Sequence, residues 1–286
     1  MMKNKVGGKK AVAAEVVKLA VLIVMFCLYM VPFVLVLINS FKQKRDIISN
    51  PFAITGGKGL TIDNYTKAFD KMHFMRSFGN SLFVTGLATL LVIVLSAMVA
   101  YYIVRNKNKA SSGIYSVMIA SMIIPFQAIM IPLVSIYGAQ FGLLNHRLTL
   151  VVLHAGFAMS MSVFMFSGFL RSSIPLSLEE AATIDGCTKM QTFFKVVFPL
   201  LKPTTATLIV LNVMSFWNDY LLPSLVLGKK ELYTLPLATY AFYGTYSADY
   251  GTIMAALILT VLPLLVLYLF LQRQIIDGVV AGAVKS

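Results

Sequence analysis

Long stretches without charge constrain this chain of 286 residues more than any other feature. A helix needs roughly 20 consecutive apolar residues to cross the hydrocarbon core of a bilayer. Only 12% of the residues are charged, against roughly 25% in soluble domains. Six stretches are long enough, and Asp219 is the one charge inside them: residues 19–41, 82–104, 114–137, 148–170, 203–228 and 250–272. We therefore expect an all-α integral membrane protein, with six transmembrane helices in one domain over residues 1–286.

The basic residues predict how these helices are oriented. The formal net charge is +13, but the Lys and Arg side chains lie in the segments between the apolar stretches and do not form one basic face. Of the 24 basic residues, 14 lie in the N-terminal tail and in the segments on its side of the membrane. Cytoplasmic loops carry an excess of Lys and Arg. We expect a multi-pass protein of the cell (inner) membrane, in contact with lipid, with both termini in the cytoplasm and no nucleic-acid partner.

The first apolar stretch is expected to stay in place as a transmembrane helix. Its basic start is typical of a signal peptide. However, its charge-free run is longer than the roughly 7–15 residues of a signal-peptide core, and no small-residue cleavage site follows it.

The segment between the fourth and fifth stretches, residues 171–203, predicts two short helices in the cytoplasm. Ser177 and Glu180 have the spacing of a capping box, in which each side chain binds a free amide at the start of a helix. Gly186 stands where the end of a helix favours a left-handed residue. The first helix is therefore expected to begin at Ser177 and to end before Gly186.

The second helix of this segment has its own start and stop signals. Thr188 and Gln191 repeat the spacing of a capping box, and Pro199 and Pro203 are expected to end the helix before the fifth span. The helix is rich in Phe and Val, so an amphipathic hairpin lying on the membrane surface remains an alternative.

The same segment carries a motif. Glu180-Ala181-Ala182 is followed after three residues by Gly186, and after nine more by Val196-Val197-Phe198-Pro199. This resembles the EAA loop of ATP-binding-cassette (ABC) importer permeases, E-A-A-x3-G-x9-[IV]-x-[LF]-P. Asn64-Tyr65 and the run from Trp217 to Pro223 resemble the carbohydrate-uptake class of these permeases, the maltose-transporter G type. The resemblance extends from about residue 15 to the end of the chain, and it implies a type I ABC importer permease fold.

The resemblance also implies partners. In that family the EAA helix docks on a cytoplasmic ATPase subunit, and nucleotide-driven closure of the ATPase dimer is transmitted through it. The expected partners are two copies of the ATPase, a second homologous permease and an extracellular or periplasmic solute-binding protein. The residues expected to couple to the ATPase are Glu180, Ala181, Ala182, Asp185, Gly186 and Pro199.

No cofactor, metal or catalytic residue is expected in this chain. A P-loop needs Ser or Thr after its Gly-Lys pair, and each of the three Gly-Lys pairs here lacks it, so ATP is expected to be bound by the partner subunits. His73, His146 and His154 are scattered along the sequence. Cys27 and Cys187 have no neighbouring metal-ligand residues.

Two apolar stretches contain candidates for a solute cavity. Pro125 and Pro132 are expected to kink the third span on either side of a polar residue, Gln127. Asp219 lies 16 residues beyond Pro203, roughly 24 Å along a helix, in the outer part of the membrane. An ionisable group inside a membrane is costly and suggests function, although a helix cap or a contact between helices explains Asp219 equally well. The cavity candidates are Gln127, Trp217, Asn218, Asp219 and Tyr220.

The expected function is therefore uptake of a sugar, an oligosaccharide in the first place, by alternating access. Two alternatives remain at this point. One is an ABC permease for another solute such as a glycerol phosphate. The other is a secondary transporter, for which buried charge pairs or inverted repeats are typical.

Overall fold

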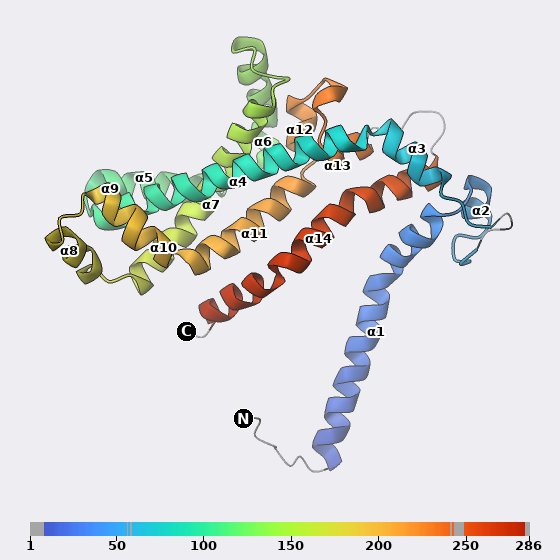
Figure 1. The fold of residues 1–286 in the computed structure, drawn as a ribbon, viewed down its shortest axis with the longest axis horizontal. Coiled ribbons are helices and arrows are strands. Elements are labelled where there is room, and N and C mark those ends of the chain that lie inside the picture. Colours follow the sequence, from blue (N-terminus) through green and yellow to red (C-terminus); the bar gives the residue numbers. More distant parts are fainter. Residues whose placement is uncertain (1–8, 56, 58, 241, 243–248, 284–286) are drawn as a thin grey trace. The chain divides into compact units, whose positions relative to one another are not determined.

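The computed structural model describes residues 9–283 except 56, 58, 241 and 243–248, and every regular element in these residues is helical (Figure 1). In these residues, four helices are long and apolar enough to cross a membrane, and the number is six when each of two bent helix pairs is counted as one span. The described residues form two compact units. Unit 1 comprises the described residues of 9–71 and 242–259, and unit 2 comprises those of 72–240 and 260–283.

Unit 1 contains three helices and the first part of a fourth, which are α1 (Lys9–Ser40), α2 (Lys44–Ser49), α3 (Asp63–Lys71) and the start of α14 (Tyr250–Ala283). Polar groups hold α3 against the end of α1. The side-chain amide of Asn64 donates to the carbonyl oxygens of Ser40 and Lys42, each at 2.8 Å. The Lys42 side chain is fully buried, and its ammonium donates to Asn39 Oδ1 at 3.1 Å.

Unit 2 is built around two long helices, α4 (Phe74–Arg105) and α7 (Arg147–Ser173), which pack most extensively against each other. Small side chains on α4 lie at this contact, among them Ala88, Ala97 and Ala100, which are fully buried. Small residues let helix backbones approach closely inside a membrane. The remaining elements of unit 2 are α5 (Lys109–Ser121), α6 (Phe126–Val134), a π-helical segment (Ser135–Gln140), α8 (Ser177–Ile184), α9 (Lys189–Thr192), a second π-helical segment (Phe193–Val197), α10 (Phe198–Leu200), α11 (Lys202–Asn218), α12 (Leu221–Val226), a 3₁₀ turn (Lys230–Leu232), α13 (Leu235–Tyr240) and the later part of α14. Of these, α5, α11, α12, α13 and the 3₁₀ turn contact α4 or α7.

Two of the predicted spans are broken. The third was expected to kink at its prolines. The structure divides it into α5 and the helix Phe126–Gln140, which meet at an angle of 98°. The break between them ends at Pro125, the residue that directly precedes the second helix. The fifth stretch, 203–228, was expected to be interrupted by Asp219, for which a helix cap was one of the explanations offered, and the structure shows that cap. Helix α11 ends at Asn218, and α12 starts three residues later because the Asp219 carboxylate accepts from the amide of Leu221 at 2.9 Å.

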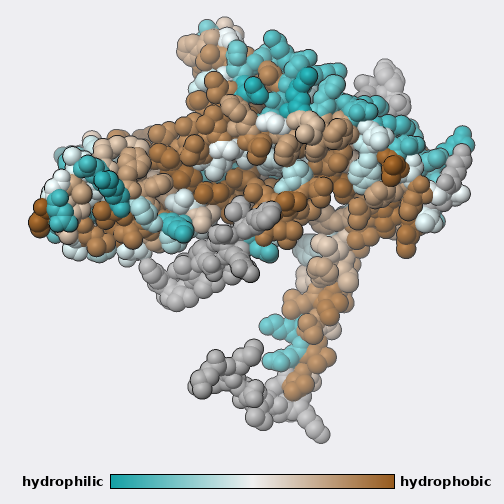
Figure 2. Space-filling view, viewed as in Figure 1, coloured by the Kyte–Doolittle hydropathy of each residue, from teal (hydrophilic) through white to brown (hydrophobic). Residues whose placement is uncertain are grey.

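The surface of unit 2 matches a chain surrounded by lipid or by other apolar protein. Hydrophobic side chains cover much of its long helices, whereas hydrophilic ones gather over the side that carries α12 and α13 and over part of the end that carries α8 and α9 (Figure 2). The exposed hydrophobic side chains include three on α4 and α7 that are each more than half exposed, namely Leu82, Leu90 and Val152. Large apolar patches of this kind mark membrane or protein contacts.

Gly251 offers a test of the packing in unit 1. A Cβ atom added there would lie 2.5 Å from Nδ2 of Asn64, whose amide is held by two hydrogen bonds. We expect Gly251→Ala to lower the stability of the purified protein by about 1–3 kcal/mol, the usual cost of overpacking, measured as a drop in Tm in detergent micelles. Gly79→Ala in α4 is the control, because a Cβ there meets nothing within 4 Å. Equal Tm values for the two variants would contradict the contact.

Candidate functional site

The segment between α7 and α11 folds into the two short helices that its sequence predicts. Helix α8 ends at Ile184, and Gly186 adopts a left-handed conformation with φ of 82°. The Thr188 hydroxyl and the Gln191 side chain form the predicted capping box at the start of α9. From Lys189 the helix continues to Leu200 and then bends by 75° into α11, between the two prolines expected to end it. We call residues 174–201 the two-helix loop.

The predicted start of α8 was wrong in one respect. Ser177 is already part of the helix, which no side-chain hydrogen bond caps. The helix is fixed instead by Glu179, whose carboxylate accepts from Arg105 Nε at 2.7 Å and from the Tyr101 hydroxyl at 2.9 Å. Arg105 also donates to the carbonyl oxygen of Ile174 at 2.9 Å. These contacts fasten the start of α8 to the end of α4.

The ion pair between Arg105 and Glu179 is largely shielded from water. The Arg105 and Glu179 side chains are 17% and 9% exposed. Charge-assisted hydrogen bonds in such surroundings are short and strong, and removing one partner of a buried pair costs several kcal/mol because the other charge stays behind uncompensated. Glu179, Arg105 and Tyr101 were not among the residues expected to have a coupling role. Arg105 could have been noticed from the sequence, because it is the basic residue that directly follows the apolar stretch 82–104.

The second helix of the loop is anchored in the core. Phe193 and Val197 are buried among side chains of α4 and α7, and the Phe193 ring lies 5.2 Å from the ring of Tyr101. A hairpin lying on the membrane surface would turn these apolar side chains to lipid. Their burial in protein favours a loop that is part of the helix bundle.

With Glu179 turned inward, its neighbours face outward. Glu180, Ala181 and Asp185 are exposed, Pro199 is exposed on α10, and Ala182 is buried. Ile184 is 86% exposed, which makes it one of the most exposed large apolar side chains of the described residues. The outer face of α8 therefore combines two carboxylates with an apolar side chain. A surface of this composition suits a protein partner that carries basic residues around an apolar cleft.

The side chains of the five cavity candidates have different surroundings. Gln127 is exposed on α6, and Asn218 is exposed with its amide donating to the carbonyl oxygen of Met214. The Trp217 indole is buried, with its N–H donating to the carbonyl oxygen of Thr260 at 3.3 Å. The ring of Tyr220 packs 4.1 Å from that of Tyr240. Asp219 lines a cavity of about 330 Å³ together with His154 and several Phe side chains.

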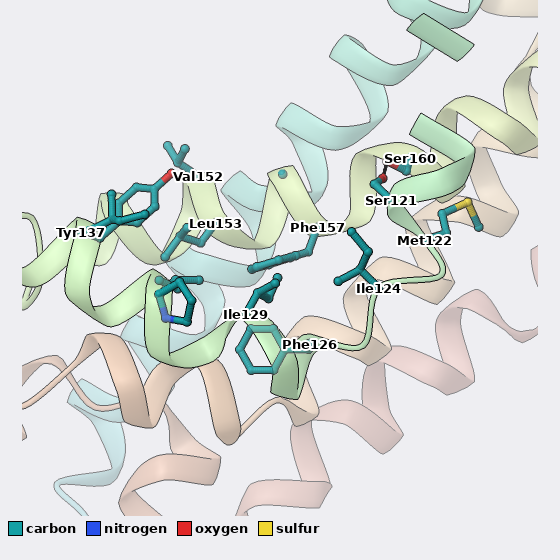
Figure 3. Close-up of a pocket in the computed structure, with 14 residues that line it drawn as sticks. Ser121, Met122, Ile124, Phe126, Ile129, Tyr137, Val152, Leu153, Phe157 and Ser160 are labelled. Carbon is teal, nitrogen blue, oxygen red and sulfur yellow. Dashed lines mark hydrogen bonds between the residues drawn. The ribbon is translucent and has the colours of Figure 1, made fainter. Parts of the chain in front are cut away.

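A second, larger cavity lies along the broken third span. It is a groove of about 620 Å³ between α5, α6 and α7, lined mostly by apolar side chains (Figure 3). Its polar end is formed by Ser121 and Ser160, whose hydroxyls hydrogen-bond at 2.9 Å, and the rings of Phe126 and Phe157 meet edge to face near its middle.

Comparison with known proteins identifies a family. The model of the family described as binding-protein-dependent transport system inner membrane component matches residues 92–280. The probable starch degradation products transport system permease protein AmyC of Thermoanaerobacterium thermosulfurigenes is 41% identical over 264 residues, 92% of this chain and 94% of that protein. The multiple sugar-binding transport system permease protein MsmG of Streptococcus mutans is 37% identical, over 90% of this chain and 92% of its own. The melibiose/raffinose/stachyose import permease protein MelC of Bacillus subtilis is 34% identical, over 91% and 93%.

Solved structures share the fold. A chain of a bacterial ABC transporter involved in the import of alginate superposes with a TM-score of 0.78, covering 93% of this chain and 98% of that chain at 20% identity. A chain of the alginate transporter in complex with a periplasmic protein that holds an alginate pentasaccharide gives a TM-score of 0.66 at 17% identity, covering 92% and 95%. The predicted type I importer permease fold is confirmed.

The contact between Arg105 and Glu179 can be tested directly. We expect Glu179→Gln to destabilise the attachment of α8 by about 2 kcal/mol, because a charge-assisted hydrogen bond is lost and the Arg105 charge remains. Amide hydrogen exchange over residues 177–184 should then quicken by roughly 30-fold, measured by mass spectrometry in micelles. Glu180→Gln, on the exposed side of the same helix, is the control and should leave the rate near that of the unmodified protein. Similar rates in both variants would disprove the anchoring role.

Proposed function

Because this chain belongs to the family of binding-protein-dependent transport system inner membrane components, we propose that it is the permease subunit through which an importer takes up an oligosaccharide. The family consists of membrane components of transport systems, which confirms the expectation of a transporter and not an enzyme. This chain is a multi-pass membrane protein that works with a solute-binding protein. The expectation of a secondary transporter is thereby set aside.

Full-length similarity to sugar permeases supports the sugar. AmyC, MsmG and MelC are named for starch degradation products, for multiple sugars, and for melibiose, raffinose and stachyose, and each aligns over 90% or more of this chain. A binding protein delivers sugars of this kind to the permease. This chain therefore needs a passage lined with groups that bind sugar hydroxyls, and not a site of high affinity.

The anchored two-helix loop supports a role in coupling this permease to an ATPase. Its outer face presents Glu180, Asp185 and the protruding Ile184, while Glu179 and Phe193 tie its two helices to α4. We infer that ATP is bound by two ATPase subunits and not by this chain. One ATPase subunit docks on the outer face of α8, and the other docks on a second, similar permease. A displacement of α8 by the ATPase then moves the end of α4, since the ion pair resists separation.

The orientation of the chain follows from the same proposal. The ATPase is cytoplasmic, so the two-helix loop and both termini lie in the cytoplasm. The excess of basic residues in the segments on that side agrees with this arrangement. The segments on the other face, including Glu231, then lie outside the membrane, where the binding protein delivers the sugar.

Reversing the charge of Glu180 tests the docking face. Glu180→Lys should leave the protein inserted, weaken co-purification of the ATPase by roughly tenfold or more, and abolish uptake of radiolabelled maltotriose and raffinose, because a charge placed opposite a like charge costs more than 1.4 kcal/mol. The control is Glu231→Lys, an exposed change on the opposite side. Normal ATPase co-purification and uptake in the Glu180 variant would exclude this face as the coupling surface.

A further inference from the structure

One pair of titratable side chains, a buried histidine and a partly exposed aspartate, lies outside the two-helix loop. Nδ1 of His154 on α7 lies 3.8 Å from Oδ2 of Asp219, which follows α11 directly. The distance is too long for a hydrogen bond. His154 is only 4% exposed, and its Nε2 has no hydrogen-bond partner within the described part of the chain. Buried polar atoms without a hydrogen-bond partner are rare in native structures.

The two oxygens of Asp219 have different tasks. Oδ1 accepts from the amides of Leu221 and Leu222 at 2.9 and 3.4 Å and so caps α12. Asn or Ser would serve equally well as a cap. Capping therefore does not account for a carboxylate inside a membrane-spanning segment, where a charge is costly. Oδ2 is the oxygen that the cap leaves over, and the Asp219 side chain remains 25% exposed.

The surroundings of this pair form a cavity of about 330 Å³ that holds both His154 and Asp219. Ser215, one helical turn before Asp219, adds a hydroxyl, and Phe126, Phe157 and Phe216 supply aromatic walls. The Phe216 ring packs 4.7 Å from the imidazole of His154. The volume lies at the lower end of the range for small-molecule sites, roughly 300–1,000 Å³.

This combination has a definite chemistry. A carboxylate oxygen and an imidazole nitrogen bind hydroxyl groups, and the bond to the carboxylate is charge-assisted. Aromatic faces accept the apolar C–H face of a ring. Resting on the function proposed above, we propose that this cavity is a subsite for one ring of the sugar in transit, with Asp219 Oδ2 and His154 contacting hydroxyls and Phe126 and Phe157 contacting the ring face.

The depth of the site agrees with this role. His154 lies seven residues into α7, about 10 Å from its start at Arg147, and Asp219 lies about 25 Å from the start of α11 at Lys202. With the two-helix loop in the cytoplasm, both residues belong to the outer half of a hydrocarbon core about 30 Å thick. A ring leaving the binding protein meets this half first.

Protection of an introduced cysteine tests the subsite without relying on transport. In the assembled transporter with Cys27 and Cys187 replaced by Ala, Ser215→Cys places a thiol in the cavity, and Ser160→Cys places one in the neighbouring apolar groove. Maltotriose or raffinose, at about five times its Kd, should slow modification by a charged thiosulfonate about sixfold at position 215. Modification at position 160 should not change.

Asp219→Asn completes the test. Asn retains the cap of α12 and removes the charge, so we expect sugar transported per ATP hydrolysed to fall about tenfold, with protection at position 215 lost. If the unmodified transporter takes up maltotriose or raffinose and neither protection nor the effect of Asp219→Asn is seen, the subsite is overturned and the transport function stands. If the unmodified transporter takes up neither sugar, the proposed function fails, and the subsite with it.

Discussion

The ion pair between Arg105 and Glu179 is the contact on which the geometry of the two-helix loop depends. Successive residues on a helix point about 100° apart, so turning Glu179 toward α4 necessarily turns Glu180 away. One interaction thus both fixes the loop to the bundle and selects the face of α8 that points outward. Tyr101 strengthens it from both sides, since its hydroxyl binds Glu179 and its ring contacts Phe193 of the second helix.

Features of the loop that depend on near neighbours were predictable from the sequence. The left-handed Gly186 and the capping box of Thr188 and Gln191 involve residues at most four apart, and both were confirmed. The cap at Ser177 was wrong because the amide of Glu180 donates to the carbonyl oxygen of Leu176 at 3.1 Å, so Ser177 already lies within the helix. The anchoring of Glu179 was not predictable either, because its partner Arg105 lies 74 residues away in the sequence and local spacing contains no information on it.

The same division holds for the spans and the cavity. Hydropathy located all six apolar stretches, because bilayer thickness sets the required length. The charge of Asp219 in the fifth stretch left a helix cap among the explanations, and two short-range hydrogen bonds to the start of α12 form that cap. His154 was regarded as one of three scattered histidines, and only the packing of α7 beside α11 brings it within 3.8 Å of Asp219. The coupling and cavity roles of the predicted residues remain to be measured.

The 98° break between α5 and α6 has a consequence for the assembled transporter. Residues 122–125 leave the helical hydrogen-bond pattern in the middle of an apolar stretch. Hydrocarbon offers no hydrogen bonds to peptide groups, and irregular backbone at membrane depth occurs only where protein or water covers it. This turn therefore cannot face acyl chains. The side of the chain that carries this turn therefore needs protein or water around it at membrane depth.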